Sequence, residues 1–141
     1  MSSIKYKYTP IPNLSDDNGK FIRRPILKIY FAGTQLSAYG LIDSGADNSM
    51  MNIGYAKLLG INLDENNRKR FRGIMGESVD CYMTKVTIIA EYFEKYPLTI
   101  PVAFIDSQNV DVLIGQDGFF DKFKIKFEKD HETFELSRSV K

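Results

Sequence analysis

An apolar run that ends in Asp-Ser-Gly is the feature of this sequence that most constrains its fold. Residues Tyr39 to Ile42 are mostly apolar, and Asp43, Ser44 and Gly45 follow directly. The apolar run predicts a buried strand, and the Ser-Gly pair predicts a tight turn at its end. Asp43 is therefore expected at the mouth of a strand, beside the core, where active-site carboxylates are often placed. A plain turn is the alternative, because Asp, Ser and Gly are common turn residues.

The rest of the chain predicts a protein built mainly of strands. Apolar or alternating runs occupy residues 26–31, 36–42, 49–53, 82–89, 96–105, 110–115, 124–127 and 133–136. Short helices are expected at 54–60, closed by Gly60 as a C-terminal cap, and at 116–123. Pro97 and Pro101 indicate that the strand at 96–105 is an edge or irregular strand. We therefore expect an all-β fold, a small closed or partly closed barrel with one or two short helices.

Length and composition narrow the function classes. A chain of 141 residues predicts one domain, with residues 1–20 as a polar N-terminal arm or loop and residues 21–141 as the folded domain. The net charge of +1 gives no reason to expect nucleic acid or an anionic membrane as a partner. No signal peptide and no transmembrane run are expected, and the single cysteine, Cys81, fits a reducing, cytoplasmic setting.

Several common catalytic chemistries fit this chain poorly. A Ser-His-Asp triad or a cysteine nucleophile would need His131, the only histidine, which lies in a charged turn. A zinc site would need several His or Cys ligands, and the chain has one of each. A phosphate-binding Gly-x-x-x-x-Gly-Lys loop does not occur in the sequence. We expect neither a metal nor a cofactor.

Asp43 suits a mechanism that uses two carboxylates. Two carboxylates in contact share one proton, so that one can deprotonate a water while the other protonates a carbonyl oxygen. The chain holds a single Asp-Ser-Gly after an apolar strand, so the second carboxylate would come from a second chain in a two-fold homodimer. The glycine-bounded segment Gly73 to Gly76, between strand-like flanks, would form a mobile lid over the site.

At this point the motifs resemble those of the retropepsin-like aspartic proteases, the single-lobe, homodimeric relatives of pepsin. The resemblance covers about residues 24–123. Arg24 to Ile29 is similar to the first barrel strand of that family, and Leu41 to Ser49 to its catalytic loop. Gly73-Ile74-Met75-Gly76 is similar to its flap, and Val112 to Asp117 to the strand behind the catalytic loop. The resemblance implies a small closed acid-protease barrel with a flap hairpin.

The resemblance also implies roles for individual residues. Asp43 would be the catalytic aspartate, with Ser44 and Gly45 completing the catalytic motif. Ser44 would bond across the dimer axis, and Asp47 would anchor Arg24 of the other chain. Substrate would be held by the remaining loop and flap residues and by one residue of the strand behind the loop: Ala46, Asp47, Asn48, Gly73, Ile74, Met75, Gly76 and Leu113.

The implied function is an aspartic endopeptidase that acts on peptide or protein substrates as a homodimer. The alternative is a peptide-binding or dimerisation module of the same fold with little or no turnover. Viral members usually carry Arg where this chain has Gln116. The replacement of Arg by Gln removes an ion-pair partner of Asp47. Asp47 would then depend on Arg24, or on Gln116 as a neutral donor.

Overall fold

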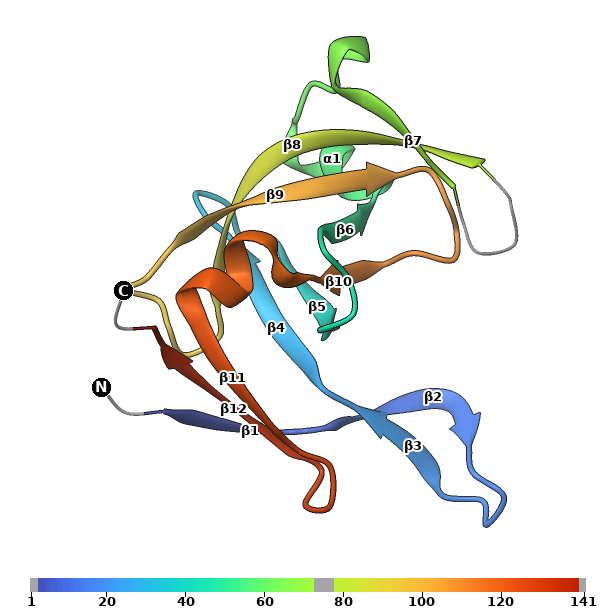
Figure 1. Cartoon of the computed structure of the whole chain (residues 1–141), viewed down its shortest axis with the longest axis vertical. Helices are drawn as coiled ribbons and strands as arrows, with labels where there is room; N and C mark the ends of the chain where they lie inside the picture. Colours follow the sequence, from blue (N-terminus) through green and yellow to red (C-terminus); the bar gives the residue numbers. More distant parts are fainter. Residues whose placement is uncertain (1–2, 73–77, 140–141) are drawn as a thin grey trace.

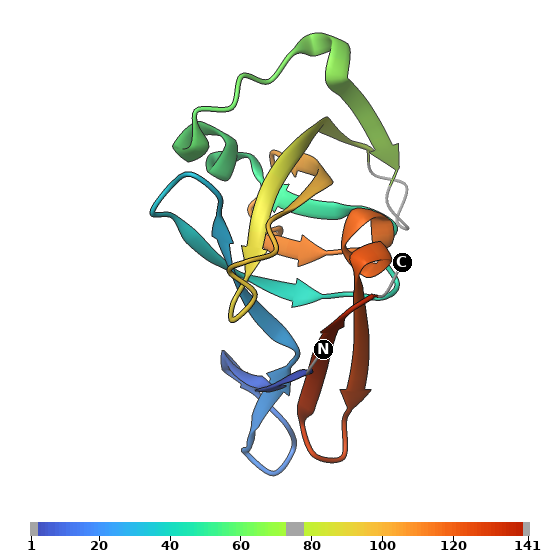
Figure 2. The same cartoon turned by 90° about the vertical axis from the view of Figure 1, so that its left-hand side faces the viewer.

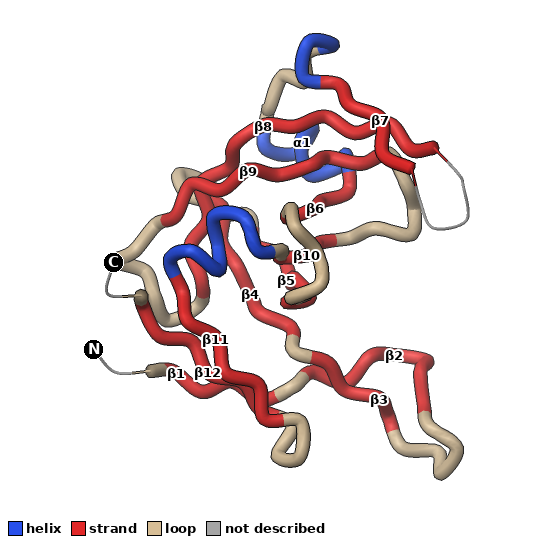
Figure 3. The backbone as a smooth tube through the Cα atoms, viewed as in Figure 1, coloured by secondary structure: helices blue, strands red, loops and turns tan. Residues whose placement is uncertain are grey.

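Figure 1 shows the computed structural model of the chain, which describes residues 3–72 and 78–139. Strands dominate, and the helical segments are short (Figure 3). The strands are β1 (Ile4–Lys7), β2 (Thr9–Ser15), β3 (Phe21–Arg24), β4 (Ile26–Phe31), β5 (Ser37–Ile42), β6 (Ser49–Asn52), β7 (Arg68–Arg72), β8 (Ser78–Ala90), β9 (Leu98–Ile105), β10 (Val112–Ile114), β11 (Phe123–Glu128) and β12 (Thr133–Arg138). The helical segments are α1 (Ile53–Leu59), the 3₁₀ turn η1 (Glu65–Asn67) and the irregular turn η2 (Gln116–Phe120).

Six of these strands close into a barrel, as the sequence predicts. The order around it is β4-β5-β10-β6-β9-β8, and β8 pairs with β4 to complete the ring. The closing pairs are Ile29 with Ala90, Tyr30 with Ile89 and Phe31 with Ile88. Because β4 and β8 pair, the ring of six strands has no edge strand whose backbone N–H and C=O groups stay unpaired.

Alternating burial explains why the barrel strands form. In β4, Leu27, Ile29 and Phe31 are buried and their neighbours are half-buried, which is the two-residue period of a strand with one face in a core. The same core receives Phe104 from β9 and Phe119 from η2, both with no exposed surface. Burial of such large apolar side chains is the main source of the stability of the fold.

The Pro-containing strand β9 is not at an edge, which corrects the sequence interpretation. β9 lies between β8, to which it is antiparallel, and β6, to which it is parallel. Pro101 lies opposite Lys85 of β8, and the pairing with β6 begins one residue later, at Val102 opposite Ser49. The missing N–H of Pro101 therefore costs no bond to β6.

The helix expected around residues 54–60 is present as α1. The side chain of Asn52 accepts a hydrogen bond from the N–H of Gly54 and so caps the start of the helix. Gly60 ends it in the left-handed conformation, with φ of 69°, which glycine adopts without strain. The second expected helix is an irregular turn, since Asp117 and Gly118 of η2 have non-helical backbone angles.

Two smaller sheets lie outside the barrel (Figure 2). The termini meet in a three-stranded sheet of order β1-β12-β11, and Tyr6 of β1 donates a hydrogen bond to the carbonyl of Glu91 at 2.5 Å. The strands β2 and β3 form a separate two-stranded ribbon. Residues 4–15 are therefore largely in strands, while the domain boundary expected after residue 20 stays a prediction.

The two arms of the expected flap hairpin are β7 and the first part of β8. They pair in register from Arg68 opposite Tyr82 to Arg72 opposite Ser78. Asp80 forms ion pairs with Arg68 and Arg70, and hydrogen bonding to Arg68 lowers the pKa of the Asp80 carboxyl. The predicted lid residues Gly73, Ile74, Met75 and Gly76 lie outside the described residues.

Candidate functional site

The loop that carries Asp43 connects β5 to β6, and the strand β10 determines its position. β10 lies between these two strands, parallel to β5 and antiparallel to β6. The N–H of Asp43 donates to the carbonyl of Ile114 at 2.9 Å. The chain after β10 then runs along the loop, because the N–H of Gln116 donates to the carbonyl of Ala46 at 2.9 Å. Backbone hydrogen bonds therefore hold both halves of the loop.

Gly115 lets the two segments approach this closely. A Cβ at this position would lie 2.5 Å from the carbonyl oxygen of Asn48 and 2.8 Å from that of Ala46. The N–H of Gly115 donates to Oγ of Ser49 at 3.1 Å, and Ser49 has no exposed surface. A buried hydroxyl and a buried N–H thus satisfy each other beneath the loop.

The Asp43 side chain is half-buried and partly fixed by its own loop. Its Oδ1 accepts a hydrogen bond from the N–H of Gly45 at 2.9 Å. The carbonyl of Asp43 accepts from the N–H of Ala46 at 3.2 Å, which closes the turn. No hydrogen-bond donor to the second carboxylate oxygen is found among the described residues. Ser44 and Gly45 at the tip of the loop are exposed.

The other predicted site residues divide into two groups. Ala46, Asn48 and Leu113 are half-buried, and Asp47 is exposed but held by its carbonyl, which accepts from the N–H of Asp117 at 2.8 Å. These residues belong to the loop or to the strand behind it, so the fold brings them together. Arg24 lies at the end of β3, exposed, where its guanidinium donates to the carbonyl of Arg23 at 3.0 Å.

Two residues of the site were not identified from the sequence in their present roles. The amide nitrogen of Gln116 donates to the carbonyl of Ser44 at 2.5 Å and so braces the tip of the loop, whereas Gln116 was considered as a donor to Asp47. Ser49 supports Gly115 from inside the core. The sequence pattern could have indicated the role of Ser49. It is the first residue of a strand with alternating burial, and it lies on the inward-facing side of that strand.

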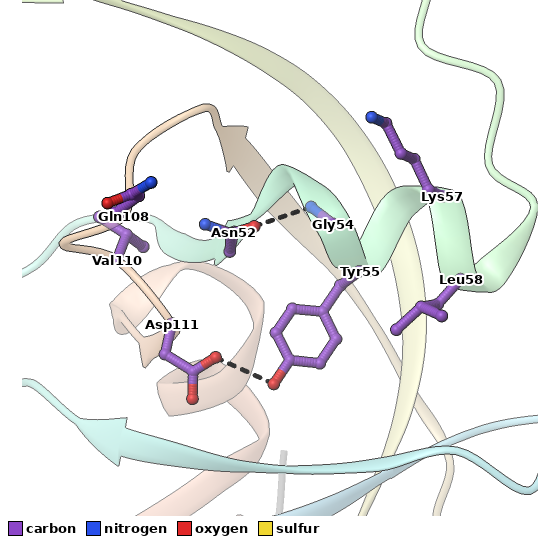
Figure 4. Close-up of a pocket in the computed structure, with 8 residues that line it drawn as sticks. All are labelled: Asn52, Gly54, Tyr55, Lys57, Leu58, Gln108, Val110 and Asp111. Carbon is purple, nitrogen blue, oxygen red and sulfur yellow. Dashed lines mark hydrogen bonds between the residues drawn. The ribbon is translucent and has the colours of Figure 1, made fainter.

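A separate hollow of about 780 Å³ lies between α1 and the segment before β10 (Figure 4). The Tyr55 hydroxyl donates to Oδ1 of Asp111 at 3.0 Å, and burial, followed by this hydrogen bond, raises the pKa of Tyr55 to about 12. Asn52 adds a bond from Nδ2 to the carbonyl of Ser107 at 2.7 Å. Predicted site residues do not line this hollow; it is lined by Asn52, Gly54, Tyr55, Lys57, Leu58, Gln108, Val110 and Asp111. These bonds anchor the segment that leads into β10.

Candidate metal ligands are sparse in the part of the chain that the structure describes. One group, Glu128, Asp130 and His131, lies at the end of β11 and in the turn that follows, with ligand atoms within 4.8 Å of one another. Nε2 of His131 lies 3.4 Å from a carboxylate oxygen of Asp130, and both residues are exposed. This turn lies outside the Asp43 loop, so the group plays no part in the candidate site.

Comparison with known proteins was made by sequence and by structure. No family model matches the chain, and no curated protein matches its sequence. A match among solved structures is the crystal structure of a retropepsin-like aspartic protease from Rickettsia conorii, with a TM-score of 0.63. The alignment covers 97% of this chain and 99% of that chain, at 12% sequence identity. The chain has the retropepsin-like fold.

This likeness confirms the fold expected from the motifs. No helix among residues 3–72 and 78–139 is long and apolar enough to cross a membrane. The cytoplasmic location expected from the single cysteine stays a prediction.

Proposed function

We propose that the protein is an aspartic endopeptidase whose active site forms when two chains bring their Asp43 side chains together. The observation that carries the proposal is the geometry of the Asp43 loop in a retropepsin-like barrel. Asp43 lies at the end of β5, backbone hydrogen bonds to β10 fix its position, and its carboxylate is oriented by the N–H of Gly45. A side chain held in this way is suited to catalysis, because preorganisation removes the cost of positioning it.

One chain supplies only half of the proposed chemistry. A single carboxylate at neutral pH is ionised and offers no proton to a substrate carbonyl. When two Asp43 carboxylates meet across a two-fold axis, they share one proton. The ionised carboxylate takes a proton from a water, whose oxygen attacks the peptide carbonyl carbon, and the protonated carboxyl donates to the carbonyl oxygen. The carboxyl that took the proton from water then protonates the amide nitrogen, the C–N bond breaks, and the other carboxylate takes back a hydroxyl proton as the carbonyl of the product acid reforms.

The other residues of the loop have supporting roles in this proposal. Ser44 and Gly45 are exposed at its tip, where they can contact the second chain and the substrate backbone. Asp47 and Asn48 would bind the substrate backbone, and Ala46 and Leu113 would line an apolar side-chain pocket. The hairpin of β7 and β8 would cover the substrate through Gly73, Ile74, Met75 and Gly76. Gln116 would keep the tip of the loop in place through the carbonyl of Ser44.

The substitution Asp43→Asn tests the proposal directly. It preserves the size of the side chain and its acceptor for Gly45 but removes the shared proton, so we expect peptide cleavage to fall by about 10³-fold or more. Cleavage of a mixture of apolar peptides, followed by mass spectrometry at acidic and neutral pH, measures the effect. Asp130→Asn, in the turn after β11, is the matched control and should leave cleavage unchanged.

A second readout separates catalysis from peptide binding. A peptide mimic with a hydroxyl in place of the scissile carbonyl should raise the melting temperature of the wild-type protein and raise it much less in Asp43→Asn. Equal cleavage by Asp43→Asn and wild type would refute the proposal. Stabilisation by peptides without cleavage by wild type would favour the binding module instead.

A further inference from the structure

The β2–β3 ribbon stands apart from the rest of the molecule. Its two strands pair only with each other, and neither contains a buried residue. Figures 1 and 2 show it extending away from the barrel. A two-stranded ribbon without a core is only marginally stable in water. We therefore expect the paired strands of the ribbon to be stabilised by packing against another surface.

Apolar side chains on the ribbon are available to such a partner. Phe21 is 61% exposed and Leu14 is 43% exposed. Phe21 also lines a hollow of about 320 Å³ together with Pro10, Pro12 and Asn13. Large exposed apolar side chains grouped on one projecting element are typical of a protein–protein contact.

The charges of the ribbon make it complementary to a copy of itself. Asp16 and Asp17 lie in the turn at its tip, and Arg23 and Arg24 lie at its base. Neither arginine forms an ion pair within residues 3–72 and 78–139, and the only side-chain bond of either is that of Arg24 to the carbonyl of Arg23. In an antiparallel two-fold contact, each acidic tip would meet the basic base of the other ribbon.

The base of the ribbon lies beside the strand that delivers Asp43. Pro25, which follows β3, accepts a hydrogen bond from the N–H of Ile42 at 3.0 Å. Asp43 is the next residue after Ile42, so the ribbon begins at the edge of the molecule where the candidate loop lies. A second chain that meets this loop would be within reach of the ribbon, whose longer strand spans roughly 20 Å.

We propose that the β2–β3 ribbon is the arm through which two copies of this chain hold each other. This inference rests on the proposed function, because it takes a second copy at the Asp43 face as the partner. The ribbons pack antiparallel through the face that carries Phe21, Pro10 and Pro12. Phe21 of each chain is buried between the ribbons, and Asp17 of each chain lies beside Arg23 of the other. Loss of the ribbon contact weakens assembly and leaves the fold of each chain intact.

The apolar part of the contact is tested by Phe21→Ser. The dimer dissociation constant, measured by analytical ultracentrifugation, should rise at least about tenfold, because one large apolar side chain is lost from each chain. Leu58→Ser is the matched control, since Leu58 is 67% exposed on α1, away from the ribbon. It should leave the dissociation constant unchanged, and circular dichroism should show that both variants are folded. Equal dissociation constants for Phe21→Ser and wild type would overturn the proposal.

A charge exchange identifies the partner as a second copy. Asp17→Lys and Arg23→Asp should each weaken the dimer, because each places like charges in contact twice. The double variant should recover much of the lost affinity, since the pairs are restored with reversed sign. If the loss of dimerisation free energy in the double variant equals the sum of the losses in the two single variants, the antiparallel contact is overturned.

The two proposals fail in different ways. Ribbon variants that remain dimeric and cleave peptides would refute the arm and leave the proposed function standing. Dimers that depend on the ribbon but cleave equally well with Asn at position 43 would support the arm and refute the dyad. A wild-type chain that is monomeric at every concentration tested would overturn both.

Discussion

The barrel strand β4 and the ribbon strand β2 are nearly equal in length but differ in what stabilises them. Every second residue of β4 is buried, and it has a strand on each side, β5 and β8. β2 has no buried residue, carries Pro10 and Pro12, and pairs only with β3. A strand of the first kind is stabilised within its own chain. A strand of the second kind keeps backbone groups and apolar side chains available for another molecule.

The largest expected effect is the difference in stability loss between two Phe→Ala substitutions, one in the barrel and one in the ribbon. Phe104→Ala removes a side chain with no exposed surface from the barrel core and should lower the free energy of unfolding by about 3–5 kcal/mol. Phe21→Ala in the ribbon should change it by no more than about 0.5 kcal/mol in the monomer. Urea denaturation at low protein concentration measures both. A similar loss for the two variants would show that the ribbon is part of the core.

A smaller effect on stability is expected from placing a methyl group at Gly115, next to the Asp43 loop. Gly115→Ala forces a methyl group against the backbone carbonyls of Asn48 and Ala46 and should cost about 3 kcal/mol. It should also displace the Asp43 loop and reduce peptide cleavage. In the matched variant Gly40→Ala, the new methyl would lie 2.8–3.0 Å from side-chain carbons of Ile114 and Val112 rather than from backbone atoms. Side chains can shift more easily than backbone carbonyls, so the cost should be lower. Equal losses for the two variants would contradict a loop fixed by its close approach to Gly115.

The smallest expected effect concerns Tyr55 of α1. Its pKa is raised from 10.0 to about 12, mainly by burial, so the folded state holds this proton more tightly than the unfolded state. The resulting contribution is complete below about pH 10 and is lost as the pH rises towards 12. Tyr55→Phe should lower stability by about 1 kcal/mol at neutral pH and flatten the alkaline decline. An unchanged alkaline profile would show that other groups cause the decline.

Much of the fold was predictable from the sequence because many of its elements carry a strong local signal. Alternation from Lys124 to Phe127 predicted β11 to within one residue at each end, and Gly60 marked the end of α1 correctly. The Asp43 loop was predicted because an apolar strand that ends in Asp-Ser-Gly resembles the catalytic loop of the retropepsin-like aspartic proteases. Local patterns of this kind do not depend on distant partners.

Features that depend on distant partners were harder to predict. Pro101 suggested an edge strand, but the register between β6 and β9 places it just before the pairing begins. The strand β2 was not expected, since Pro10 and Pro12 weaken any strand signal and only β3 supports it. The bond from Gln116 to the carbonyl of Ser44 joins residues that are close only after β10 has been inserted between β5 and β6.

The central claim is that one chain holds half of an active site and that a second chain completes it. The most direct test is the rate of peptide cleavage per chain as a function of protein concentration, measured alongside the dimer fraction by analytical ultracentrifugation. We expect the rate per chain to rise in proportion to the dimer fraction and to vanish in the monomer. A constant rate per chain at concentrations where the protein is monomeric would contradict the account.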